Sequence, residues 1–157
     1  NFLATGFYSG YWPWAPGTAG SLAAGILAYF LLRSSPLLTS LPGGIVLALL
    51  FTALGIFAAN AVCDAALYGP DNKDPKQVVI DEFAGYFVTI AGLGGGIREL
   101  AVGFIAFRVF DIIKPPPIRR LEKLPRGYGI VLDDVLAGVY AAAAARLVLA
   151  AADFFLR

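Results

Sequence analysis

VVIDEFAGY, at residues 78–86, places two adjacent carboxylates inside an apolar run. An ionised carboxylate in such surroundings is costly unless a cation or a hydrogen-bond donor meets it. The stretches FRVFDIIK (107–114) and GIVLDDV (129–135) have the same character. We therefore expect the acids of the three stretches to converge on one divalent-metal site that handles a phosphate; they are Asp81, Glu82, Asp111, Asp133 and Asp134.

The composition indicates a membrane protein or an unusually apolar helical one. Hydrophobic residues make up 59% of the 157 residues and charged residues only 15%, against about 25% in typical soluble domains. The length fits one helical domain over residues 1–157. The net charge of +1 provides no strong field for nucleic acid, and a single cysteine excludes an intrachain disulfide. The first residues lack the basic n-region of a signal peptide, so we do not expect one.

Apolar segments separated by Gly, Pro and Ser predict an all-α, multihelical bundle. None of them shows the strict alternation of a strand. Thr18 is a natural N-cap for the first helix, and Pro115 to Pro117 end the fourth. The expected helices cover residues 18–32, 43–62, 78–93, 100–113 and 133–156, with a short basic surface helix at 118–126.

The distribution of basic residues favours a membrane-embedded bundle. Residues 43–62 carry no charge and would reach about 30 Å, the hydrocarbon thickness. Five spans with the N-terminus inside put residues 1–18, 63–82 and 108–134 on the cytoplasmic side. That side then holds eight Lys and Arg (Lys73, Lys76, Arg108, Lys114, Arg119, Arg120, Lys123, Arg126) against three outside (Arg33, Arg98, Arg157). All three carboxylate stretches fall on the cytoplasmic side in this threading.

Each acidic motif also has a purely structural interpretation. Asp81-Glu82 and Asp133-Asp134 could open helices and interact with the helix dipole. Asp111 lies in the middle of an apolar segment, where capping cannot explain it.

The charged residues of the fourth segment share one helix face. Arg108, Asp111 and Lys114 are spaced i, i+3, i+6, which keeps them within about 120° of one another. They form either a salt-bridge ladder on a wet face or a metal ligand flanked by two phosphate-binding cations.

The motif PGTAGS at residues 16–21 could simply cap a helix. It also offers free N–H groups at a helix N-terminus and the hydroxyls of Thr18 and Ser21, which suit an anion.

Other phosphatase mechanisms are excluded by the residues that the chain lacks. The absence of histidine excludes mechanisms that use a phosphohistidine or a histidine acid. A cysteine phosphatase built on Cys63 would need arginine six residues later, where Gly69 stands. A phosphoaspartate mechanism of the haloacid dehalogenase type would need an Asp-x-Asp motif after a strand, and the sequence has none. What remains for phosphoryl chemistry is a metal-activated water held by carboxylates, with Mg²⁺ as the natural ion.

Together the motifs resemble those of the phosphatidylglycerophosphatase A family, in order and over nearly the whole chain. The motifs are PGTAGS (16–21), KDP (73–75), VVIDE (78–82), FRVFDIIKP (107–115), PIR (117–119) and GIVLDD (129–134) through Gly138. The resemblance implies a lipid phosphatase of the bacterial inner (cytoplasmic) membrane with its active site facing the cytoplasm. It would hydrolyse phosphatidylglycerophosphate to phosphatidylglycerol and inorganic phosphate, using Mg²⁺. The phospholipid in the bilayer would be its partner.

The resemblance also implies a role for each residue. The catalytic acids would be Asp81, Glu82, Asp111, Asp133 and Asp134, and the last four would ligate the metal. Asp81 would be a further ligand or would orient one. The substrate phosphate would be bound by Thr18, Ser21, Arg108 and Lys114.

Two other classes of protein stay open at this point. A carboxylate-lined membrane ion-binding or ion-pathway protein without phosphatase activity would explain acids in apolar helices. It would not explain the cations on the same side. A soluble helical protein with no lipid role is the third interpretation.

Overall fold

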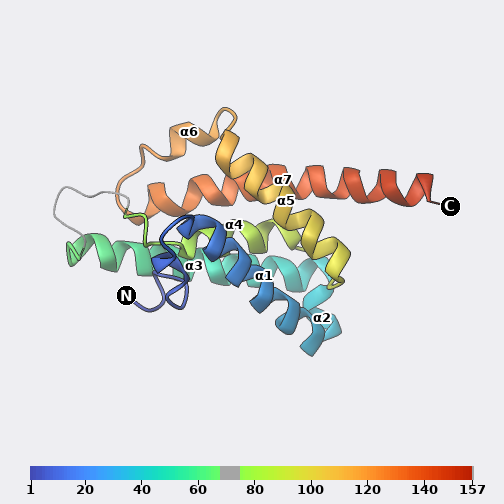
Figure 1. Cartoon of the computed structure of the whole chain (residues 1–157), viewed down its shortest axis with the longest axis horizontal. Helices are drawn as coiled ribbons and strands as arrows, with labels where there is room; N and C mark the ends of the chain where they lie inside the picture. Colours follow the sequence, from blue (N-terminus) through green and yellow to red (C-terminus); the bar gives the residue numbers. More distant parts are fainter. Residues whose placement is uncertain (68–74, 157) are drawn as a thin grey trace.

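The computed structural model describes residues 1–67 and 75–156, and within them the chain is helical with no strand. The predicted all-α class is therefore confirmed. Lys73 and Asp74, which belong to the KDP motif, lie outside the described residues. The elements (Figure 1) are η1 (Ser9–Tyr11), α1 (Pro16–Ser34), α2 (Pro36–Thr39), α3 (Leu41–Asp64), α4 (Ile80–Ile90), α5 (Ile97–Ile113), α6 (Ile118–Leu121) and α7 (Gly127–Phe155).

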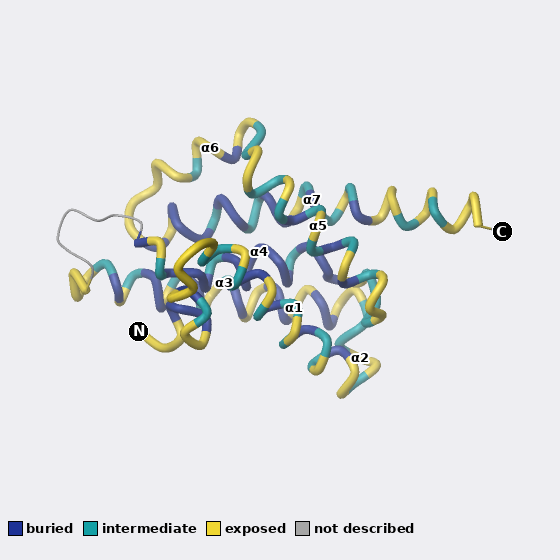
Figure 2. The backbone as a smooth tube through the Cα atoms, in the orientation of Figure 1, coloured by how far each residue is buried: buried dark blue, intermediate teal, exposed yellow. Residues whose placement is uncertain are grey.

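Helix α4 is the centre of the bundle. It contacts α1, α3, α5 and α7, and nine of its 11 residues are buried (Figure 2). A helix that is apolar all round can only be stable when neighbours cover every face. The ring of Phe87 stacks on that of Phe51 from α3, with centroids 4.1 Å apart and an interplanar angle of 5°. The stretch VVIDEFAGY (78–86) therefore supplies the first two turns of the core helix.

Helices α4 and α7 approach each other closely because both carry glycine at the contact. A Cβ added to Gly138 would meet the carbonyl of Gly85 and lie 3.1 Å from the Cβ of Val88. A Cβ added to Gly85 would lie 2.6 Å from the carbonyl oxygen of Asp134. At Gly138 the nearest atoms are backbone, which cannot turn aside as a flexible side chain can, and at Gly85 the Phe107 ring and the Asp134 carbonyl leave no room. The close contact fixes Asp134 of α7 beside α4.

The predicted helix starts differ from the observed ones by two or three residues for α1, α3, α4 and α5 and by six for α7. Helix α1 begins at Pro16 rather than after a Thr18 cap, because proline suits the first helical position. Helix α7 begins at Gly127, six residues before Asp133. The N–H of Gly127 donates to Oδ1 of Asn60 at 3.0 Å, and a Cβ there would lie 2.7 Å from the Asn60 nitrogen. This contact with α3 decides where α7 starts, despite the low helix propensity of glycine.

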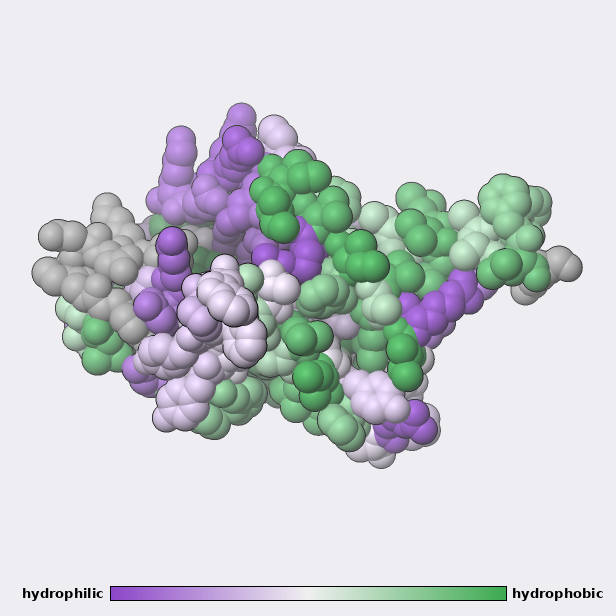
Figure 3. Space-filling view, in the orientation of Figure 1, coloured by the Kyte–Doolittle hydropathy of each residue, from purple (hydrophilic) through white to green (hydrophobic). Residues whose placement is uncertain are grey.

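Two of the described helices, α3 and α7, are long and apolar enough to cross a membrane by length and composition. In their most apolar windows only 39% and 22% of the residues are buried inside the bundle. The five-span expectation is wrong for α4, because 11 residues reach only about 16 Å, against a hydrocarbon thickness of about 30 Å. Hydrophilic side chains gather mostly at the end of the molecule that carries α6, while hydrophobic ones cover much of α5 and α7 (Figure 3).

Replacing Gly138 by alanine tests the close packing of α4 on α7. Because the new Cβ would press on the backbone of Gly85, we expect the unfolding free energy to fall by about 1–3 kcal/mol. The matched control is Gly25→Ala, whose Cβ would lie 3.6 Å from the hydroxyl of Tyr86, an ordinary contact. The control should be neutral or gain about 0.4–1 kcal/mol. Denaturant unfolding of both variants in detergent decides, and equal stabilities would contradict the packing argument.

Candidate active site

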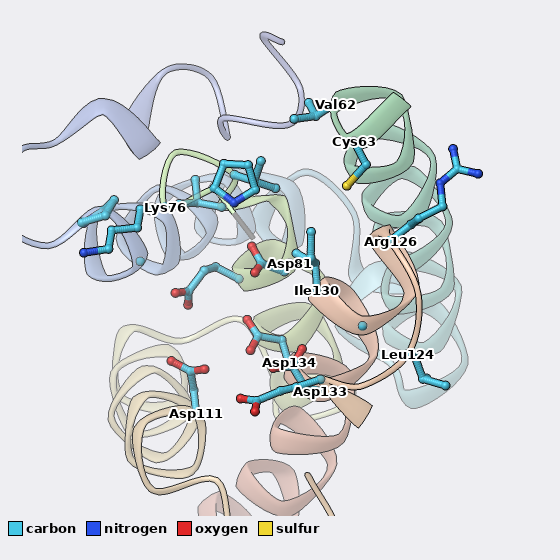
Figure 4. A pocket seen from close by; sticks show the side chains of 18 of the residues that line it. Val62, Cys63, Lys76, Asp81, Asp111, Leu124, Arg126, Ile130, Asp133 and Asp134 are labelled. Carbon is cyan, nitrogen blue, oxygen red and sulfur yellow. The ribbon is translucent and has the colours of Figure 1, made fainter. Parts of the chain in front are cut away.

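A pocket of about 970 Å³ lies where five helix ends meet. The N-terminal ends of α1, α4 and α7 and the C-terminal ends of α3 and α5 supply its walls. All five predicted acids line it: Asp81, Glu82, Asp111, Asp133 and Asp134. In Figure 4 the labelled carboxylates of α4, α5 and α7 point into the same space. Helix N-termini carry partial positive charge, so three of these ends favour anions.

Arg108 joins acids from two helices on one side of the pocket. Its Nη1 lies 2.7 and 2.6 Å from the two carboxylate oxygens of Glu82 and 2.8 Å from Oδ2 of Asp111. The same nitrogen lies 3.2 Å from Oγ of Ser21, which in turn donates to Glu82. The predicted Arg108–Asp111 pair exists, but its side chains are 17% and 12% exposed, so the wet-face ladder is wrong. The pair belongs to the interior of the site.

Burial raises the pKa of the Glu82 carboxyl to about 7, and the positive charge of Arg108 opposes that rise. Asp111 adds a second negative charge nearby, which raises the pKa further. The guanidinium of Arg108 and the hydroxyl of Ser21 favour the ionised form. Gly17 completes this corner, because any Cβ there would meet Oε1 of Glu82. The site thus needs positive charge to hold its acids ionised.

On the other side of the pocket, Lys114 provides a positive charge to the acids, as Arg108 does for Glu82 and Asp111. It lies just beyond α5 with a φ of 46°, and its Nζ is 2.6 Å from Oδ2 of Asp133 and 2.9 Å from Oε1 of Glu122. Burial lowers the pKa of the Lys114 ammonium, but the hydrogen bonds and attraction of Asp133 and Glu122 outweigh it and leave that pKa raised. Lys114 therefore stays charged and turns to α7 rather than to Asp111.

The structural interpretation of the α7 acids is wrong. Asp133 and Asp134 lie in the second turn of α7 and are almost wholly buried, so neither caps it nor sits in its first turn. Asp81 and Glu82 do lie in the first turn of α4, where a dipole contribution also applies. For Asp133 and Asp134, a role in the site is the explanation that remains.

The motif PGTAGS (16–21) contributes other groups to the site than the two hydroxyls that were predicted to bind the phosphate. Pro16 and Gly17 line the pocket, whereas Thr18 is exposed and does not line it. Ser21 is buried and serves Glu82. Asn60 anchors the start of α7 and was not predicted to have a role. As the single amide in the apolar stretch 43–62, it could have been identified from the sequence as a buried polar contact.

The chemistry of the donor set suits Mg²⁺, which prefers hard oxygen ligands. Oδ1 of Asp133 is buried and has no hydrogen-bond partner among the described residues, which is the chemistry of an oxygen able to ligate a cation. In the described part of the chain, however, no three acids lie close enough together to hold one ion. Glu82, Asp111 and Asp133 are each paired with Arg108 or Lys114 instead. Metal ligation by these acids stays a prediction.

Removing the Lys114 charge tests whether it stabilises the buried acid. Lys114→Gln should lower the unfolding free energy by about 1–3 kcal/mol, because Asp133 loses its charged partner. The double variant Lys114→Gln/Asp133→Asn should recover most of that loss. Lys123→Gln, at an exposed position of the same pocket rim, is the control and should stay within about 0.5 kcal/mol of the parent. A single variant as stable as this control would contradict the pairing.

The sequence of the chain is similar to those of known lipid phosphatases. A phosphatidylglycerophosphatase A of Haemophilus influenzae is 41% identical over 143 residues, covering 90% of this chain and 83% of that protein. A phosphatidylglycerophosphatase A of Escherichia coli is 38% identical over 144 residues, covering 90% and 78%. A Bacteroides thetaiotaomicron protein, provisionally named a phosphatidylinositol-3-phosphatase, is 41% identical over 144 residues, covering 88% and 86%.

The search of solved structures returned no match. The model of the family described as phosphatidylglycerophosphatase A matches residues 2–149, nearly the entire chain. On this match and on the identity to its relatives, the chain belongs to the phosphatidylglycerophosphatase A family.

Proposed function

We propose that this chain hydrolyses the terminal phosphate monoester of phosphatidylglycerophosphate, a lipid phosphatase activity that its family membership supports. The observation that carries the proposal is the pocket itself, where acids and cations from three helices meet at one end of an apolar bundle. A soluble enzyme would not need such an apolar exterior. An ion pathway would not need Arg108 and Lys114 paired to the acids.

The contacts of the two cations indicate different roles. Lys114 lines the pocket and is proposed to bind the substrate phosphate as a compact point charge. Arg108 forms ion pairs with Glu82 and Asp111. Its main proposed role is to position these two acids, and it would act on the phosphate indirectly through them. Ser21 donates to Oε2 of Glu82, the same oxygen that Arg108 contacts.

In the reaction, water attacks phosphorus, the bond from phosphorus to the glycerol oxygen breaks, and the leaving alcohol takes up a proton. A pocket carboxylate accepts the proton of the water. We propose Glu82, Asp111, Asp133 and Asp134 as the residues that hold Mg²⁺, with Asp81 as a further ligand or an orienting group. When bound, Mg²⁺ would supply the positive charge that offsets these acids and the phosphate, and would polarise a phosphoryl oxygen.

Two apolar helices and bacterial relatives indicate a membrane-associated protein. We place it in the inner membrane with the pocket toward the cytoplasm. Lys76, Lys123 and Arg126 line the pocket alongside Lys114, and cytoplasmic segments of membrane proteins carry an excess of such residues.

Phosphate release from defined lipids tests the proposal. The purified chain in mixed micelles should release phosphate from phosphatidylglycerophosphate, lose that activity in excess EDTA and regain it with Mg²⁺. Ca²⁺ should restore it poorly, because Ca²⁺ takes looser and larger coordination. Full activity in EDTA would contradict the metal mechanism.

A second part of this experiment tests which lipid head group the protein accepts. One relative carries the name of a phosphatidylinositol-3-phosphatase, so phosphatidylinositol 3-phosphate is the second candidate substrate. Faster phosphate release from phosphatidylinositol 3-phosphate than from phosphatidylglycerophosphate would make the former the preferred substrate and contradict the proposal. Release from neither lipid, with the chain folded and Mg²⁺ present, would favour the ion-binding alternative.

Asp134→Asn separates a catalytic acid from a structural one. Asp134 is 3% exposed and shares the pocket with five other carboxylates, so neutralising it removes repulsion in the metal-free protein. We expect unchanged or higher thermal stability without Mg²⁺. Turnover at saturating Mg²⁺ should fall on the order of 100-fold or more, the scale for key electrostatic groups. Turnover near that of the parent would remove Asp134 from the catalytic set.

A further inference from the structure

A second concave surface runs between α1 and α5, outside the pocket of acids. Its volume is about 450 Å³, and almost all of its lining is apolar. We call it the α1–α5 groove; it is lined by Leu22, Gly25, Ile26, Tyr29, Phe30, Tyr86, Ile97, Leu100, Ala101, Phe104 and Ile105. The mechanism described above uses none of these residues.

The floor of the groove is built to be apolar and open. Tyr86 comes from the core helix α4, and its hydroxyl donates to the carbonyl of Leu100 at 2.9 Å, which satisfies the polar end of the ring. Gly25 leaves room above that ring, since a Cβ there would meet only the phenol and the adjoining ring carbons at 3.6–3.8 Å. The rims carry large exposed side chains, with Phe30 66% and Ile97 71% exposed. The result is a slot with apolar walls.

The groove ends beside the catalytic pocket. On α1, Leu22 of the groove directly follows Ser21, which donates to Glu82. On α5, Ile105 precedes Arg108 by three residues, a rise of about 4.5 Å. From this end the groove follows α1 from Leu22 to Phe30, about 12 Å. Polar and apolar surfaces are therefore continuous, as a molecule with an anionic head and a hydrocarbon tail requires.

We propose that the α1–α5 groove binds one acyl chain of the phospholipid substrate while the phosphate occupies the pocket of acids. This inference rests on the proposed function. Bulk lipid could cover a convex apolar face equally well. A concave slot whose near end lies one residue from Ser21 and three residues from Arg108 along their helices would instead hold a chain in a defined register with the phosphate. Remote binding of the chain would then orient the head group for reaction.

Filling the groove tests the proposal by kinetics. Ala101→Phe adds a ring at an exposed alanine inside the groove, and Ala143→Phe adds the same ring at an exposed alanine of α7 that does not line it. The substrates are dipalmitoyl and dihexanoyl phosphatidylglycerophosphate in detergent. Each buried methylene strengthens binding about fourfold, so displacing even two of them predicts a KM rise on the order of tenfold for the long-chain lipid.

The expected pattern is specific to the groove. Ala101→Phe should raise KM for the dipalmitoyl lipid and leave the dihexanoyl lipid nearly unchanged, while Ala143→Phe should change neither. Equal kinetics of both variants on both lipids would overturn the groove. If the parent protein hydrolyses neither lipid, the proposed function fails instead, so the two failures are distinguishable.

Photolabelling provides a readout that does not depend on a variant folding. Vesicles containing phosphatidylglycerol with a diazirine at the end of one chain are mixed with the unmodified protein, and labelled peptides are mapped. We expect label concentrated near Phe30 and Ile97, at the far end of the groove, and displaced by unlabelled phosphatidylglycerol. Label spread evenly over α3 and α7, or a cross-linked dimer joined through α1 and α5, would overturn the proposal.

Discussion

The pairing of buried acids with two cations is the constraint on which the rest of this structure depends. Glu82, Asp111 and Asp133 lie in an apolar bundle, where an ionised carboxylate without a partner would destabilise the fold by several kcal/mol. Arg108 and Lys114 remove that cost by joining α5 to α4 and to α7. The same contacts leave a concentrated negative charge facing one pocket. A bundle that only needed to fold would place hydrophobic residues there, so the acids point to function.

The helical arrangement delivers these charges to one place. Helix α4 is covered by four others and carries its acids in its first turn, at the mouth of the bundle. Close contact at Gly85 and Gly138 brings α7 against it, and Asn60 sets where α7 begins. Much of the remaining surface is apolar (Figure 3), and α3 and α7 are long and apolar enough to cross a membrane. A polar end and an apolar body are what an enzyme acting on a membrane lipid requires.

The sequence was most informative where a signal is local. The uncharged stretch 43–62 predicted α3, which extends from Leu41 to Asp64, and i, i+3 spacing predicted the Arg108–Asp111 pair. It was least informative where distant residues decide. Ser21 meets Glu82 across 61 positions, and Lys114 meets Asp133 across 19. The start of α7 depends on Asn60, so propensity alone placed it six residues too late. The short α4, with nine of its 11 residues buried, resembles a membrane span in its apolar composition but is too short to be one.

The central proposal is that the five acids, which line one pocket, together bind a divalent cation. Thermal unfolding of the detergent-solubilised protein across a Mg²⁺ titration, without substrate and at constant ionic strength, tests it most directly. Because an ion that binds only the folded state stabilises it, the account predicts a Tm that rises with Mg²⁺, by about 2.7 kcal/mol of stability at a hundred times Kd. The rise should be largely lost in Asp133→Asn, whose parent carboxylate has a buried oxygen to which no described residue donates a hydrogen bond. A Tm that does not respond to Mg²⁺, or responds equally in the variant, would contradict the account.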